Sequence, residues 1–378
     1  MKSVYFPGLN GIRFIAAFLV ILDHIELLKG YMGIPTLWNE PFSAHLGNIG
    51  VTIFFVLSGF LITYLLLSEK SITDIKIAAF YIRRILRIWP LYYLIIILGF
   101  FILPYIPLFN IPHYATPPES FPWPTFLTYG TLLANFGFIY CSPIAFAGIL
   151  WSVAVEEQFY LVWPIIVKYV KSPLRFFIVL LIFYFVLKIV SFFPGLGIQA
   201  YLPHSFYHWL DRTRISCMII GGIGAYLLFT QAKFPLRWTY SRANQFLQMG
   251  IFILVLSNIL SSSLFNFFKN EFFAVNIILL ILNIAANPKT LIRMENVFFH
   301  FLGKISYGLY VYHLIIAAMV IKGISNWEAI NSISPLLSGL IIIIITTLLT
   351  ILISHLSYRY FESYFLRIKN QYSIIQTG

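Results

Sequence analysis

The feature that most constrains the fold is a series of apolar runs, each close to the length that crosses a bilayer. A spanning helix needs about 20 mostly apolar residues, and eleven runs begin near residues 12, 47, 88, 125, 150, 173, 215, 246, 271, 303 and 334. The mean hydropathy is +0.86, and only 10% of the 378 residues are charged, against about 25% in soluble domains. We therefore predict an all-α, polytopic transmembrane helical bundle that forms a single domain over residues 1–378.

The formal net charge of +12 would suggest a nucleic-acid ligand in a soluble protein. Here the basic residues lie in short connections between apolar runs, which is the pattern of the positive-inside rule. We expect the lipid bilayer as surroundings and no nucleic-acid partner. The two cysteines, Cys141 and Cys217, have no metal-ligand spacing, so no metal is expected.

The distribution of basic residues predicts the topology. The 68–90 connection carries five basic residues and the 107–123 connection carries none, which places them on opposite sides. The run at 125–141 is short and is interrupted by Asn135, Gly137 and Pro143, so we expect a re-entrant or shallow segment. About ten full crossings, with both termini cytoplasmic, then place 19 of the 25 basic residues inside; eleven crossings is the alternative. The remaining basic residues are Lys29, Lys188, Arg212, Arg214, Lys269 and Lys322.

Two charged residues stand out in the first run, GLNGIRFIAAFLVILDHIELL. Arg13 and His24 are eleven residues apart, which on a helix is about 20° beyond three turns and a rise of about 16 Å. Both should lie on one stripe that faces the bundle interior or a wet cavity, because a charge facing lipid is costly. His24 is a candidate general base, with Asp23, Glu26 or a carboxylate of another span to orient it. The alternative is that Arg13 only snorkels and His24 only bonds a neighbouring helix.

A second cluster opens the third run, in FYIRRILRIWPLYYL. Arg84 and Arg87 are three residues apart and Arg83 and Arg87 are four apart, so they are neighbours on a helix. Guanidinium groups match phosphate oxygens, and the cluster therefore predicts a phosphate clamp; simple anchoring at the cytoplasmic surface is the alternative. With His24 deeper in the bundle, the arrangement suits a ligand with a phosphorylated head and a long thin arm, the shape of coenzyme A.

Glu156 and Glu157 lie within another apolar run, where a carboxylate is a functional candidate. Adjacent residues on a helix point about 100° apart, so at most one should share a site with His24, and we favour Glu156. The alternative is a carboxylate that pairs with a buried base such as Arg13.

Three further polar residues could each have a catalytic role or a structural one. Ser58 is a nucleophile or part of a small-residue packing patch. Tyr307 and His313, six residues apart, either act directly in catalysis or have a structural role or contact the acceptor.

These motifs occur in an order that resembles the integral-membrane acyltransferase-3 family over nearly the whole chain. The matching segments are a basic residue, ten spacers and a histidine from Arg13 to His24, followed by FFVLSGFLI (54–62), RRILRIWP (83–90), LWSVAVEEQFYLVWP (150–164) and ISYGLYVYH (305–313).

The resemblance implies an acyl-CoA-dependent O-acyltransferase of the bacterial cytoplasmic (inner) membrane. Its co-substrate would be acyl-CoA, most often acetyl-CoA, and its acceptor a cell-surface or lipid-linked carbohydrate such as lipopolysaccharide. The resemblance also implies that His24 takes part in the transfer step, as general base or as a brief carrier of the acyl group, and that Arg13, Arg84 and Arg87 support donor binding or the structure of the site. The arguments from the residues themselves add further candidates: Asp23 and Glu156 as catalytic residues, Arg83 as a donor-binding residue, and Ser58, Tyr307 and His313 as acceptor or structural residues.

Some relatives of this family carry a fused extracytoplasmic domain. This chain ends soon after its last predicted span, so we expect no fused domain here, and any such partner would be a separate protein. Two other functions stay open: a proton-coupled solute transporter, and an acyltransferase that acts on a small molecule or a lipid.

Overall fold

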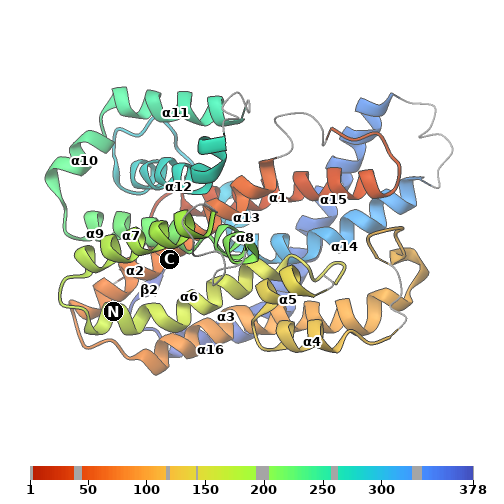
Figure 1. Ribbon diagram of the computed structural model, residues 1–378, viewed down its shortest axis with the longest axis horizontal. Helices are drawn as coiled ribbons and strands as arrows, with labels where there is room; N and C mark the ends of the chain where they lie inside the picture. The colour runs from red at the N-terminus through yellow and green to blue at the C-terminus, as the bar shows by residue number, and fades with distance from the viewer. Residues whose placement is uncertain are drawn as a thin grey trace.

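The structure, a computed structural model, describes residues 3–37, 45–115, 120–141, 144–192, 204–256, 263–325 and 334–377. These residues form an all-α, multi-pass bundle (Figure 1), as the apolar runs predict. Eight of the described helices are long and apolar enough to cross a membrane. Lys2 and Pro143, which entered the topology prediction, lie outside the described residues.

Long helices occupy every predicted run except the one at 125–141. They are α1 (Leu9–Tyr31), α2 (Leu46–Lys70), α3 (Ile77–Ile97), α6 (Leu150–Tyr169), α7 (Pro173–Phe192), α9 (Ile215–Phe229), α11 (Arg242–Leu256), α12 (Ser263–Ala286), α14 (Ser306–Ser325) and α15 (Pro335–Ser357). The shorter elements are β1 (Ser3–Val4), α4 (Trp123–Gly130), α5 (Ala134–Tyr140), α8 (His204–Thr213), α10 (Lys233–Thr239), α13 (Val297–Lys304), α16 (Ser363–Gln371) and β2 (Gln376–Thr377). Short π- or 3₁₀-helical turns cover Leu98–Ile102, Leu103–Tyr105, Pro107–Phe109 and Tyr358–Glu362.

The run at 125–141 folds as two short helices. α4 has 8 residues and α5 has 7, and neither is long enough to cross a bilayer. Between them, Leu132 has a φ of 60°, a left-handed conformation that a continuous helix does not allow. The prediction that this run is not a full crossing is confirmed.

The two ends of the described chain lie side by side. β1 pairs in parallel with β2, with Ser3 opposite Gln376 and Val4 opposite Thr377. Ends on one side of a bilayer require an even number of full crossings, which is compatible with ten and with the eight candidate spans but not with eleven.

The charged helix α1 is enclosed by other helices. It packs against α2, α13 and α14, and Ala16 and Val20 have 0% exposure. At its far end the Glu26 carboxylate accepts a hydrogen bond of 2.8 Å from Lys29 Nζ, and both side chains are buried. The two charges at this end of α1 are therefore paired within the protein, as the cost of an unpaired charge in hydrocarbon requires.

The helix α2 is at the centre of the packing, with α1, α6, α9 and α12 around it. Its contact with α9 depends on glycines. A Cβ on Gly59 would lie 2.0 Å from the carbonyl oxygen of Met218, and one on Gly221 would lie 2.2 Å from that of Val56. Small residues at such positions let two backbones approach closely, which is how membrane helices associate.

Three of the six basic residues that the topology prediction placed on the outer side are buried in the bundle: Lys29, Lys188 and Arg214. Lys188 Nζ, at 0% exposure, lies 3.0 Å from Glu271 and 3.1 Å from Asp211. Arg214 donates to the carbonyl oxygen of Asn48 at 2.9 Å and to its side chain at 2.6 Å. These contacts join α7, α8 and α12, and tie the start of α9 to α2.

The glycine contact between α2 and α9 can be tested with one substitution. We expect Gly221→Val to lower the thermal unfolding midpoint in detergent by several degrees, because overpacking typically costs about 1–3 kcal/mol. Gly250→Val is the matched control, since a Cβ at Gly250 meets nothing within 4 Å. Equal midpoints for the two variants would contradict the close approach.

Candidate functional site

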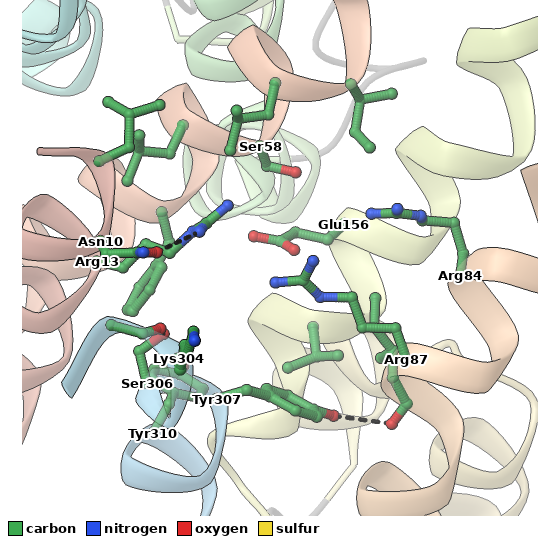
Figure 2. Close-up of a pocket in the computed structure, with 18 of the residues that line it drawn as sticks. Asn10, Arg13, Ser58, Arg84, Arg87, Glu156, Lys304, Ser306, Tyr307 and Tyr310 are labelled. Atoms are coloured by element: carbon green, nitrogen blue, oxygen red, sulfur yellow. Dashed lines mark hydrogen bonds between the residues drawn. The ribbon is translucent and has the colours of Figure 1, made fainter. Parts of the chain in front are cut away.

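A cavity of about 380 Å³ opens among α1, α2, α3, α6, α14 and α16 (Figure 2). Its volume lies within the range of small-molecule sites, about 300–1,000 Å³. Val4 and Asn370, from the two ends of the chain, both line it. The cavity therefore opens towards the face where β1 and β2 pair.

Basic side chains outnumber carboxylates in the wall of this cavity. Five basic residues face two acidic ones: Arg13, Arg84, Arg87, Lys304 and Lys369 against Glu156 and Glu362. Low-dielectric walls strengthen the field of such a cluster. The cavity is therefore built for an anionic ligand.

Arg13 and Arg87 point towards the carboxylate of Glu156 from different walls (Figure 2). Arg13 Nη1 also donates to Asn10 Oδ1 at 3.0 Å. Within the described residues, neither arginine forms an ion pair with a carboxylate. Both guanidinium groups thus keep donors available to a ligand.

Arg84 is held by aromatic rings. Its Cζ lies 5.7 Å from the ring centre of Phe80 and 5.9 Å from that of Tyr160, distances at which a cation is attracted to a ring face. Its Nε is buried and has no hydrogen-bond partner in the described part of the chain. The two rings therefore hold the guanidinium group at the cavity wall and leave one of its N–H donors without a partner among the described residues.

Glu156 belongs to a hydrogen-bonded chain that reaches Ser58. The Tyr160 hydroxyl donates to Glu156 at 2.9 Å and is also hydrogen-bonded to Ser58 Oγ. Glu157 faces elsewhere and accepts from Trp89 Nε1 at 2.8 Å. Of the two adjacent carboxylates, only Glu156 lines the cavity. Ser58 lines it too, with a tyrosine and not an imidazole as its partner.

Arg83 lies outside the wall of this cavity. Its Nη2 donates to Glu69 at 3.0 Å and its Nη1 donates to the carbonyl oxygen of Tyr372 at 2.8 Å. Arg83 thus ties α2, α3 and the segment after α16 together. Arg84 and Arg87 face the cavity, whereas Arg83 is turned away from it.

His24 and His313 form a pair beyond the cavity. Nδ1 of His24 and Nε2 of His313 are 2.7 Å apart, and the rings are nearly parallel, at 12° and 5.0 Å between centres. His313 has 0% exposure. Neither histidine lines the cavity, which differs from the expectation that His24 and Arg13 share one passage. The partner of His24 is a second imidazole from α14.

The carboxylates near His24 in sequence have other contacts. Asp23 lies against the first turn of α2, where its Oδ2 would be 2.4 Å from a Cβ on Gly47. Glu26 pairs with Lys29 at 2.8 Å. The structure therefore brings neither residue to the ring nitrogen of His24 that contacts His313.

Tyr310 lies between the cavity and the histidine pair. It lines the cavity, its hydroxyl is 2.7 Å from Ser152 Oγ, and its ring centre is 6.0 Å from that of His313. Tyr307, one turn earlier, donates to the carbonyl oxygen of Ile88 at 3.0 Å (Figure 2). The side chain of Tyr310 therefore contributes to the cavity wall and also contacts the ring of His313.

Several residues of the cavity were not predicted from the sequence. They are Tyr160, Lys304, Tyr310, Glu362 and Lys369. The spacing of three between Tyr307, Tyr310 and His313 was a usable signal for one of them. Among the described residues, no group of three or more His, Cys, Asp or Glu side chains could hold a metal ion.

Comparison with known proteins gives a family match over most of the chain. Residues 6–355 match the acyltransferase domain model, acyltransferase-3. The O-acetyltransferase OatA of Staphylococcus aureus is 27% identical over 95% of this chain and 57% of its own length. The peptidoglycan O-acetyltransferase OatA of Listeria monocytogenes is 29% identical over 45% of this chain and 26% of its own length.

Another Staphylococcus aureus protein, from strain COL and provisionally named an O-acetyltransferase, is 26% identical over 96% of this chain and 58% of its own length. The chain thus spans less than two thirds of the length of these relatives. No solved structure matches the chain.

The tie made by Arg83 can be tested by hydrogen–deuterium exchange. We expect Arg83→Ala to raise exchange of residues 363–377 several-fold, because the contacts to Glu69 and Tyr372 are lost and local opening becomes easier. Arg175→Ala removes the same charge from an exposed position on α7 and should leave this exchange unchanged. The same exchange in both variants would show that Arg83 does not hold the segment.

Proposed function

The chain belongs to the acyltransferase-3 family, and from this premise we propose that it is a membrane O-acyltransferase. It transfers an acyl group, most simply acetyl, from cytoplasmic acyl-CoA to a hydroxyl of a cell-surface or lipid-linked carbohydrate. The names of the relatives support O-acetylation, and the Listeria relative is named for peptidoglycan as its acceptor. The observation that carries the donor assignment is the excess of basic side chains in the cavity.

The donor site consists of Arg13, Arg84 and Arg87. Coenzyme A carries a pyrophosphate and a ribose phosphate, and guanidinium groups bind phosphate oxygens through two parallel hydrogen bonds. Glu156 limits the positive charge and orients the arginines that point towards it. The phosphates would occupy the end of the cavity near the paired chain ends, and the pantetheine arm would extend towards Tyr310.

The reaction needs a base at the deep end of this site. The acceptor oxygen attacks the thioester carbonyl carbon, a C–O bond forms and the C–S bond breaks. His24 takes the hydroxyl proton, and the coenzyme A thiolate leaves and is protonated. Because Tyr310 separates the cavity from His24, the Tyr310 side chain must move for the thioester and the imidazole to meet at about 3–3.5 Å.

His313 sets the tautomer of His24. Of the two ring nitrogens of His313, Nε2 contacts His24, and Nδ1 is buried without a hydrogen-bond partner among the described residues. With the proton of a neutral His313 on Nδ1, Nε2 accepts, and His24 donates through Nδ1 across the 2.7 Å contact. That tautomer leaves Nε2 of His24 with its lone pair, which is the form a general base requires.

The proposed activity is tested with the purified full chain in nanodiscs and radiolabelled acetyl-CoA. Wild type should bind and consume acetyl-CoA, and His24→Ala should lose roughly 10²–10⁴-fold in rate, the usual contribution of a general base. His355→Ala, a histidine of α15 outside the cavity wall, should retain the rate. Failure of wild type to bind or consume acetyl-CoA, with uptake of a labelled solute instead, would support a transporter.

His313 should act on the rate and not on donor binding. We expect His313→Ala to lower kcat for acetyl transfer at least about tenfold with the KM for acetyl-CoA unchanged, because His24 loses its tautomer control. His313→Gln, whose amide oxygen can accept from His24 Nδ1, should recover part of the rate. A parallel rise in KM, or no recovery with Gln, would indicate a structural role.

A further inference from the structure

The last part of the chain contributes to the cavity although it lies beyond the family match. That match ends at residue 355. The cavity wall nevertheless includes five later residues, Tyr358, Glu362, Leu366, Lys369 and Asn370. Residues that the family match does not cover therefore complete this wall of the cavity.

Helical geometry explains why these late residues all face the cavity. Tyr358, Glu362, Leu366 and Lys369 are spaced by four, four and three residues, which places them on one face of a helix. A π-helical turn at Tyr358–Glu362 links α15 to α16, and such turns are frequent at functional sites. α16 then runs beside α3 (Figure 1), the helix that carries Arg84 and Arg87.

Lys369 adds a positive charge where positive charge is already concentrated. It interacts electrostatically with Arg13, Arg84 and Arg87. In the described part of the chain Lys369 forms no ion pair. Like charges destabilise one another, so such a grouping is maintained where an anion neutralises it.

Lys369 is also at the junction of two cavities. A smaller cavity of about 30 Å³ shares Lys369 and Arg84 with the main one, and is lined on its other side by Ser373 and Ile375. Its remaining basic residue, Arg83, is already paired with Glu69. Lys369 and Arg84 are therefore the basic groups available to a ligand that reaches from the main cavity towards the C-terminal segment.

We propose that α16 is part of the donor site and that Lys369 binds a phosphate group of acyl-CoA at the mouth of the cavity. A lysine binds phosphate as a point charge, beside the forked contacts of the arginines. The inference rests on the proposed function, because it takes acyl-CoA as the ligand. It goes further in assigning donor recognition to a segment that the family match does not cover.

The test measures binding of coenzyme A to the purified full chain. Lys369→Gln should raise the Kd roughly ten- to hundred-fold, as expected for the loss of one charge-assisted hydrogen bond. Lys369→Arg should bind close to wild type. Arg367→Gln is the matched control. Arg367 is on the same helix and exposed, and among the described residues it is bonded only to the carbonyl oxygen of Ser363, one turn earlier.

The phosphate in contact is identified with 3′-dephospho-coenzyme A. If Lys369 binds the ribose phosphate, Lys369→Gln weakens coenzyme A binding and leaves 3′-dephospho-coenzyme A binding unchanged. If Lys369 binds the pyrophosphate, Lys369→Gln weakens the binding of both ligands equally.

A second measurement does not depend on a variant. Coenzyme A should slow hydrogen–deuterium exchange of residues 363–372 in the wild type, because the ligand contacts α16. Equal Kd values for Lys369→Gln and Arg367→Gln, or unchanged exchange in a wild type that binds coenzyme A, would overturn the role of Lys369 and leave the proposed function standing. A wild type that binds no coenzyme A would overturn both.

Discussion

A charge in the hydrocarbon region must be neutralised by protein or by a ligand, and this requirement organises the molecule. It divides the charged residues into two groups. Lys188 with Glu271, and Lys29 with Glu26, are paired within the bundle and tie helices or turns together. The arginines around the cavity lack such partners in the described chain, although they are enclosed by the same helices. Charge that the protein leaves unbalanced in this way is stabilised when an anion occupies the cavity.

The central helix α2 takes part both in close helix packing and in the polar wall of the cavity, because its faces carry different residues. One face carries Gly59, which allows the backbone of α9 to approach closely. The adjacent residue, Ser58, points into the cavity and is linked through Tyr160 to Glu156. Close packing on one side therefore holds the polar wall rigid on the other. Preorganisation of this kind is what binding and catalysis require of a scaffold.

Much of the fold was predictable because helix formation in a bilayer is decided locally. Every backbone donor must be satisfied within its own segment, so apolar length alone located the spans, and interruptions such as Asn135 and Gly137 located the short helices. Rotation about a helix axis was harder to predict. Arg83 and Arg84 are adjacent in sequence, yet one is bonded to Glu69 and the other faces the cavity, since neighbours on a helix point about 100° apart.

The sequence by itself determined the class of protein, the approximate positions of the long helices, and the segments in which polar residues gather. Only the tertiary structure decided which of those residues meet. His24 contacts His313 across 289 positions of sequence, and Lys369 reaches the arginines of α3 because α16 turns back along that helix. The physical reason is that helix formation depends on neighbours along the chain, whereas a site depends on how distant helices pack and rotate against one another.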